Sequence, residues 1–468
     1  MLRIAIASLF VAPLLSGCNA FRTPYQRPNT TTPTYYAHAD AEARASLDRW
    51  WNAYRDLNLN NLIDEALRVN PDLALAALNV RAAALQTNLA VLNPTVAVGY
   101  TYEASKPLTG AGPTSLFRSL TASASYEIDL WGQLDAMRDV ARWEERATRE
   151  DRESAALILI RSVVDLYLEI ADLNHQISVG EADFADLEKT LGLVKILKAA
   201  GGATALDVAS AEQALESQRA AQAQLIEARV EHRNALTLLL AGTPWPENQE
   251  LKEVPDDPPP AVDSGLPAGL LDRRPDLRAA ELRLLETLAQ TDATRLSFYP
   301  NLILTGSVGT ASTGLSEVLS NPLGSLAASL SLPFIQLNQA KFATALARTQ
   351  YDQAVLHFQK ALWQGLSDVD NALSARQQLT EQGASLERSL HDAEYIGHLT
   401  QIRFRAGAVS LSAYLAAQDS VRAADLALAA NHLAQLENYA ALCLSLGGGS
   451  KIISKEFAAR VAGTTGPP

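Results

Sequence analysis

The chain is poor in cysteine, methionine, aromatic and charged residues. This composition excludes several kinds of site and partner. Cys18 and Cys443 are its two cysteines, which excludes a disulfide framework and a zinc site built from several cysteines. Two methionines cannot supply a relay of soft copper or silver ligands. Lysines and arginines number 39 against 52 aspartates and glutamates, and the formal charge of −13 argues against a nucleic-acid partner.

Motifs of common enzyme classes are missing as well. The sequence contains no phosphate-binding loop ending in Gly-Lys-Ser or Gly-Lys-Thr, no His-Glu-x-x-His and no Gly-x-Ser-x-Gly. Among the scattered histidines, His391 and His398 could share a helical face, but a solvated face explains them better than a metal site. We expect no enzyme activity, no cofactor and no metal site.

The first residues have the features of a bacterial lipoprotein signal. Arg3 precedes an apolar stretch that is too short to span a bilayer and ends in Leu14-Leu15-Ser16-Gly17-Cys18. This ending resembles the lipobox, in which the cysteine becomes the lipidated first residue, and Asn19 then implies sorting to the outer membrane. A plain signal peptide cleaved near Cys18 is the alternative. No later stretch is long and apolar enough for a helix across the inner membrane.

An internal repeat organises the rest of the chain. Asn70-Pro71-Asp72-Leu73 recurs as Arg274-Pro275-Asp276-Leu277, and later pairs such as Pro94 with Pro300 and Gly201 with Gly407 keep one constant separation. A single register over so long a stretch indicates a gene duplication. Each half is therefore predicted to contain a helix, two strands, a very long helix, a sharp turn and a second long helix.

Four segments alternate apolar and polar residues with the period of a β-strand. The expected strands are 94–105, 118–129, 300–311 and 325–335, each about as long as a tilted strand that crosses a bilayer. On this pattern Leu330 faces lipid and Ser329 the opposite side. A half-buried sheet in a soluble protein would give the same alternation.

Four strands are too few to close a membrane barrel, because such barrels begin at about eight strands and an open edge in lipid leaves backbone groups unpaired. The chain must therefore oligomerise. Two copies would give a barrel filled by side chains, whereas three would leave room for a water-filled lumen.

Long helices without proline are expected over 132–200 and 338–406, followed by returning helices over 204–241 and 409–446. Leu187, Leu191 and Val194 have the spacing of a coiled-coil seam, although an ordinary core face would give the same spacing. Gly201, Gly202 and Gly407 mark the turns, because glycine readily takes the left-handed backbone at a helix end. Each half therefore contains an antiparallel helical hairpin.

Several motifs in this framework resemble the outer membrane factors of bacterial tripartite efflux pumps, the TolC-like or OprM-like, NodT-type lipoproteins. The motifs are Trp50-Trp51, Tyr126-Glu127-Ile128-Asp129-Leu130-Trp131-Gly132, Arg273-Arg274-Pro275-Asp276-Leu277-Arg278, Arg405-Ala406-Gly407 and the closing Leu446-Gly447-Gly448-Gly449. Their order along nearly the whole mature chain carries the resemblance.

The resemblance implies an α+β membrane protein whose three copies each give four strands to one twelve-stranded outer membrane β-barrel. This barrel continues into a long periplasmic barrel of coiled helices. The expected divisions are a lipoprotein signal peptide at 1–17, a lipid-anchored segment at 18–56, repeat 1 at 57–242, a linker in the equatorial region at 243–266, repeat 2 at 267–449 and a tail at 450–468. The linker belongs to a belt around the helices in this family; a loose connection between the repeats is the alternative.

By the same resemblance the chain is a passive duct in the cell outer membrane for drugs or other small toxic compounds. It would receive them from a periplasmic adaptor protein and an inner membrane transporter of the RND type. Its partners would be two further copies, the adaptor, the transporter and outer membrane lipid. The alternatives are the exit channel of a type I protein secretion system and a lipid-anchored coiled-coil scaffold without a pore.

Candidate site residues follow from the resemblance. Cys18 is the lipid attachment site, and a periplasmic gate is expected near the turns at Gly201, Gly202 and Gly407. Candidate gate residues beside the turns are Asp207, Phe404 and Arg405. Three copies would place three Asp207 carboxylates around one axis, a ring that attracts cations. Aspartate is also favoured at the start of a helix, so a capping role for Asp207 is equally open.

Overall fold

The structure, a computed structural model, describes residues 21–449 except for 30–32, 38–46, 91, 110–111, 258–259, 261, 263–266 and 314–321. Cys18, the signal peptide at 1–17 and the tail at 450–468 lie outside the described residues. The chain divides into two compact units. The first comprises residues 1–30, 78–149 and 279–360, and the second comprises 31–77, 150–278 and 361–468.

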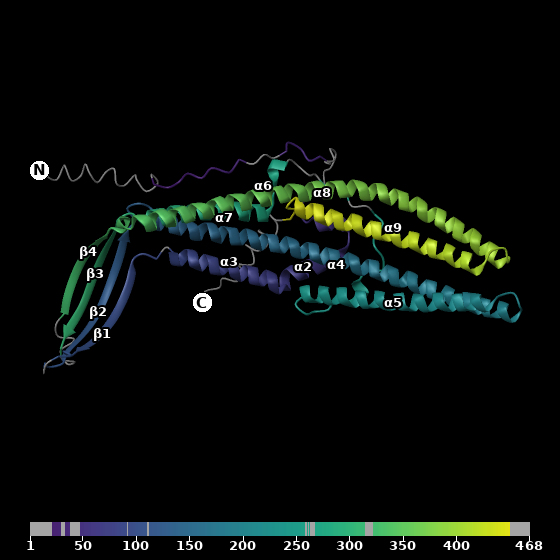
Figure 1. Cartoon of the computed structure of the whole chain (residues 1–468), viewed down its shortest axis with the longest axis horizontal. Helices are drawn as coiled ribbons and strands as arrows, with labels where there is room; N and C mark the ends of the chain where they lie inside the picture. Colours follow the sequence, from purple (N-terminus) through teal and green to yellow (C-terminus); the bar gives the residue numbers. More distant parts are fainter. Residues whose placement is uncertain are drawn as a thin grey trace. The chain divides into compact units, whose positions relative to one another are not determined.

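The first unit contains a four-stranded antiparallel sheet in the order β1-β2-β3-β4 (Figure 1). Its strands are β1 Thr95–Ser105, β2 Ser115–Ile128, β3 Asn301–Ser312 and β4 Pro322–Ser331. The central pair, β2 with β3, joins segments from the two halves of the chain. The sheet is therefore a product of both halves.

Three strand ends differ by more than one residue from the ranges expected from alternation. β2 begins at Ser115 instead of 118, because Ser115 still pairs with Ser105 of β1. β4 occupies Pro322–Ser331 instead of 325–335, and Pro333–Ile335 forms a short 3-10 helix. Proline fixes φ and has no N–H to donate to a ladder, so the strand ends before it although the alternation of residue types continues.

Long helices make up most of the remaining chain. They are α2 Leu57–Val69, α3 Pro71–Ala90, α4 Gln133–Ala199, α5 Ala205–Leu239, α6 Leu270–Arg273, α7 Pro275–Leu296, α8 Leu337–Arg405 and α9 Leu411–Ser445. Helices α3, α4, α7 and α8 have residues in both units. Within the described ranges, no helix combines the length and the apolar character needed to cross a membrane.

An aromatic group fixes the segment before α2 in the second unit. Trp50 and Trp51 are almost completely buried, and the ring of Trp50 meets those of Tyr54 and Tyr439 edge-on, with centres 6.3 and 6.2 Å apart. The Tyr54 hydroxyl donates to the carbonyl oxygen of Leu436 at 2.9 Å. The Trp50-Trp51 pair is therefore part of the core, where it attaches this segment to α9.

Helices α4 and α8 end in the same backbone motif. Gly201 has a φ of 78° and Gly407 a φ of 71°. In each case the next N–H donates to the carbonyl five residues earlier, Gly202 to Leu197 and Ala408 to Arg403, both at 2.8 Å. This is the Schellman motif, and its left-handed residue explains the glycine at both turns.

Helices α5 and α9 also end on left-handed residues, but these residues differ. Gly447 takes a φ of 74° after α9, whereas Ala241 takes a φ of 56° after α5. A Cβ at position 447 would lie 2.6 Å from the carbonyl carbon and oxygen of Arg273. Glycine at 447 is thus required by packing as well as by backbone conformation, while Ala241 carries the steric cost of a Cβ in this region.

The turns after α5 and α9 should respond in opposite ways when glycine and alanine are exchanged. Ala241→Gly should leave stability unchanged or raise it by up to about 1 kcal/mol, because relief of the left-handed alanine exceeds the added chain entropy. Gly447→Ala should cost about 2 kcal/mol or more, because the new methyl group meets the backbone of Arg273. Thermal loss of the helical circular dichroism signal in detergent measures both. A Gly447→Ala protein as stable as the wild type would contradict the close packing at Arg273.

Candidate functional site

The sheet has one apolar face. Its register places Leu302 opposite Leu330, and Tyr126 opposite Leu304. Large side chains of this face are mostly open to the surroundings in the single chain: Val96, Val98, Tyr100, Tyr102, Tyr126, Val308, Leu326 and Leu330 are all 47% to 86% exposed. Soluble monomers rarely expose so continuous an apolar surface, so this face requires another environment.

The opposite face is dominated by small and hydroxyl-bearing residues. One row across all four strands consists of Ala97, Ser123, Ser307 and Ser325. The hydroxyl oxygens of Ser307 and Ser325 are 2.6 Å apart and hydrogen bonded. Phe117, Ile303 and Leu323 are large apolar exceptions on this face. Small polar side chains suit contact with water, so the two faces differ in the solvent they fit.

Both outer edges of the sheet lack a neighbouring strand within the described residues. β1 pairs with β2 alone, and β4 pairs with β3 alone. The outward N–H and C=O groups of β1 and β4 would cost several kcal/mol each if they were left unpaired in lipid. A sheet with this apolar face can therefore enter a membrane only when further strands close its edges.

At the hairpin ends in the second unit, one of the expected gate residues, Phe404, packs against a small buried cluster. Val194 of α4, Ala211 of α5 and Tyr414 of α9 are buried together, and Phe404 packs against them. The ring of Phe404 stacks on that of Tyr414, with centres 4.8 Å apart and planes 5° from parallel. Phe404 is thus held by packing within one chain, whereas Arg405 at the end of α8 is exposed.

Asp207 belongs to a capping box at the start of α5. Thr204 is the N-cap, and its hydroxyl accepts the N–H of Asp207 at 3.2 Å. In return the Asp207 carboxylate accepts the N–H and the hydroxyl of Thr204, both at 2.7 Å. These hydrogen bonds lower the pKa of Asp207 below its usual range. The capping role is therefore present, and it keeps the Asp207 carboxylate charged.

An acidic group on the second unit was not foreseen from the sequence. Asp165, Glu169 and Asp172 have the spacing of one face of α4. Their negative charges act on the carboxyl group of Glu437 in α9. Burial, together with the charges of Asp165 and Glu169, raises the pKa of Glu437 to about 7. The spacing on α4 is visible in the sequence, but the approach of Glu437 depends on the tertiary fold.

Comparisons with known proteins agree with these features. The family model for the outer membrane efflux protein matches residues 62–242 and 266–448. The toluene efflux pump outer membrane protein TtgF of Pseudomonas putida is 31% identical over 470 residues, covering 96% of this chain and 98% of the relative. The pyoverdine export outer membrane protein OpmQ of Pseudomonas putida is 29% identical over 420 residues, covering 86% and 88%.

A solved structure shows the same fold. The crystal structure of the open state of the Neisseria gonorrhoeae MtrE outer membrane channel is 27% identical to this chain and has a TM-score of 0.79. The similarity covers 92% of this chain and 98% of that chain. It therefore includes both the sheet and the long helices.

Lysine substitutions on the two faces of β4 test the assignment of the apolar face. Leu330→Lys should cost about 2 to 4 kcal/mol if the residue lies near the middle of the bilayer, because lysine would be placed in lipid. Ser329→Lys is the matched control on the opposite face and should be tolerated. The yield of detergent-resistant oligomer measures both effects. Equal damage from the two substitutions would show that the faces are wrongly assigned.

Proposed function

The chain belongs to the outer membrane efflux protein family, and we propose that it is the outer membrane exit channel of a tripartite efflux pump. The exposed apolar face of the sheet, combined with two edges that have no neighbouring strand among the described residues, carries this proposal. Three copies pair β4 of one chain with β1 of the next and close a twelve-stranded barrel. The apolar face then contacts lipid, and the hydroxyl-rich face lines a water-filled passage.

The protein acts as a duct and not as an enzyme, so energy for transport comes from its partners. These are a periplasmic adaptor and an inner membrane transporter of the RND type, and the cargo is drugs or other small toxic compounds. The relatives named for toluene efflux and pyoverdine export support a cargo of small molecules. The hairpin ends around Gly201 and Gly407 form the periplasmic gate and the contact with the adaptor.

The two halves of the chain are repeats from a gene duplication. Two separate matches to one family model, at 62–242 and 266–448, support this origin. The connecting segment at 243–266 belongs to the equatorial belt. In support, Glu250 accepts a 2.7 Å hydrogen bond from Arg233, and the carbonyl of Leu251 accepts one of 2.9 Å from Asn174. Contacts of this kind distinguish a packed belt from a loose connection.

Reconstitution and gene deletion test the function. Purified protein in a planar bilayer should give stepwise ion conductance, and deletion should increase sensitivity to small toxic compounds without changing protein secretion. Absence of conductance from folded protein would favour the scaffold. Lost secretion of a protein with unchanged sensitivity would favour a type I secretion channel.

The gate is tested by Asp207→Asn, which removes the charge but keeps an oxygen that can accept the Thr204 N–H. Cation preference in single-channel recordings at low salt should fall, because three carboxylates around one axis attract cations. In the wild type this preference should persist to a pH below the usual aspartate range, because the Thr204 hydrogen bonds lower the pKa of Asp207. Thr204→Ala, which removes the N-cap side chain but keeps the charge, should leave selectivity intact. Unchanged selectivity in Asp207→Asn would leave only the capping role.

Lipid attachment is proposed at Cys18. Wild-type protein should incorporate labelled palmitate, and Cys18→Ala should not. Oligomer formation should continue in the variant, because strand pairing does not require acyl chains. Each buried methylene adds about 0.8 kcal/mol of membrane affinity, so the variant should also be extracted more easily. A wild type without label would mean that the N-terminus is a plain signal peptide.

A further inference from the structure

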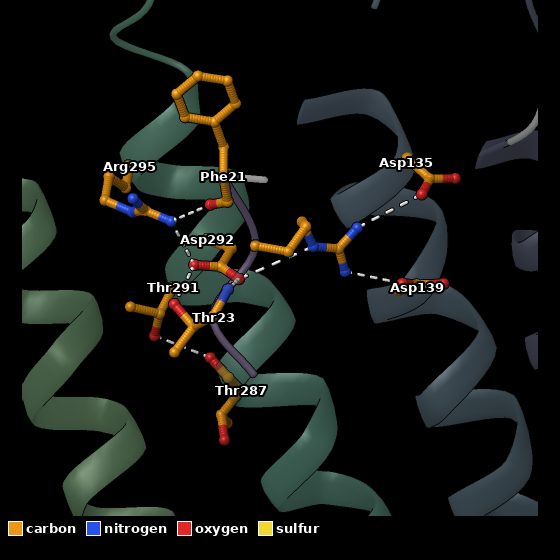
Figure 2. Close-up of polar contacts among 9 residues, drawn as sticks. Phe21, Thr23, Asp135, Asp139, Thr287, Thr291, Asp292 and Arg295 are labelled. Carbon is orange, nitrogen blue, oxygen red and sulfur yellow. Dashed lines mark hydrogen bonds and ion pairs between the residues drawn. The ribbon is translucent and has the colours of Figure 1, made fainter. Parts of the chain in front are cut away.

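A short N-terminal segment, residues 21–27, lies along α7 in the first unit and is called the strap here. Figure 2 shows the contacts of its first residues with α7 and α4. Arg22 and Arg27 make the strap basic, and the helix surfaces beneath it carry carboxylates. Opposite charges and a set of directed hydrogen bonds indicate a specific binding site for this segment.

Asp292 of α7 is the first attachment point. Its side chain is only 2% exposed, and it accepts the N–H of Thr23 at 2.7 Å and the hydroxyl of Thr23 at 2.8 Å. Arg295, one turn further along α7, donates to the same carboxylate at 2.8 Å and also to the carbonyl of Phe21. A buried carboxylate without such partners has a high desolvation cost. The hydrogen bonds from the strap offset part of this cost for Asp292.

Arg22 connects the strap to α4 as well. Its guanidinium lies 3.7 Å from Asp292, 2.7 Å from Asp139 and 3.5 Å from Asp135. The side chain is 16% exposed. One arginine thus bridges carboxylates of two helices. Removal of the strap would take this positive charge away from the three carboxylates.

Glu281 is the second attachment point, about three turns before Asp292 on α7. Arg27 donates two hydrogen bonds to its carboxylate, both 2.7 Å, and the Tyr25 hydroxyl donates one of 3.0 Å. Three helical turns span about 16 Å, which matches an extended strap of four residues together with the arginine side chain. Pro24 favours the extended backbone. The two points therefore fix the register of the strap on α7.

The strap begins at the end of the sheet. The ring of Phe21 meets those of Trp131 and Tyr299 edge-on, with centres 5.4 and 6.0 Å apart. Trp131 lies just after β2, and its indole N–H donates to the carbonyl of Pro300, which precedes β3, at 2.7 Å. Tryptophan and tyrosine are typical of membrane interfaces, so this cluster suits the boundary between lipid and water.

We propose that α7 carries a binding site for the strap of the same chain, with Asp292 and Glu281 as its two fixed points, and that this site ties the lipid anchor to the sheet. Phe21 is the third residue after Cys18, and three extended residue steps reach about 10 Å. A strap held at Asp292 thus keeps an anchor at Cys18 near the Trp131 cluster. The tie to an anchor rests on the lipidation of Cys18 proposed above, whereas the binding site does not.

Trypsin tests the site, because it can cleave after Arg22 but not at Arg27, which precedes Pro28. Full-length protein in detergent is digested, and new N-termini at Thr23 are followed by mass spectrometry. Cleavage should be at least about tenfold faster in Asp292→Asn, because the charged hydrogen bonds that hold the strap on α7 are lost. Glu144→Gln is the matched control, because Glu144 pairs with Arg283 between α4 and α7 without touching the strap. It should be cleaved like the wild type.

Equal cleavage of Asp292→Asn and wild type would overturn the proposal. If Asp292→Asn fails to fold by circular dichroism, Glu281→Gln decides, since it releases only the partly exposed Arg27 and Tyr25. Faster cleavage in Glu281→Gln supports the site, and wild-type cleavage overturns it. Palmitate label should leave with the cleaved peptide. A protein without label would refute lipidation at Cys18 while the cleavage rates still report on the strap.

Discussion

The outward backbone groups of β1 and β4 set the main constraint on this protein. One chain offers an apolar sheet face to its surroundings and two edges without partners among the described strands. Lipid satisfies the face but not the edges, and water satisfies the edges but not the face. Closure with further copies satisfies both at once. The proposed oligomer and the proposed lumen lined by the opposite face both rest on this single requirement.

In the helical part, the ends of the long helices are stabilised by local interactions. Both long hairpins turn on a left-handed glycine, and both returning helices begin with a side-chain cap, Thr204 for α5 and Ser410 for α9. The backbone motifs agree, although the residues differ: Asp207 completes the first cap, while Ala413 at the second has no carboxylate. Similar backbones with different side chains allow the two hairpin ends to differ in charge while keeping one shape of turn.

Much of the fold could be predicted from the sequence because its signals are local. Period-two alternation located the strands, freedom from proline located the long helices, and Gly201 and Gly407 located the turns. Alternation misplaced the end of β4, since it reports residue types and Pro333 ends hydrogen bonding. Contacts between distant segments were also missed. Three such contacts depend on tertiary packing. They are the stacking of Phe404 on Tyr414, the approach of Glu437 to α4 and the hydrogen bond from Thr23 to Asp292.

The number of chains in the closed assembly tests the central claim most directly. Native mass spectrometry of the wild-type protein, released from detergent micelles, should give the mass of three chains. Three copies provide twelve strands, enough for a water-filled lumen, whereas two provide eight and a filled interior. A stable monomer or dimer in membrane-extracted, folded protein would contradict closure of the sheet edges into a twelve-stranded channel.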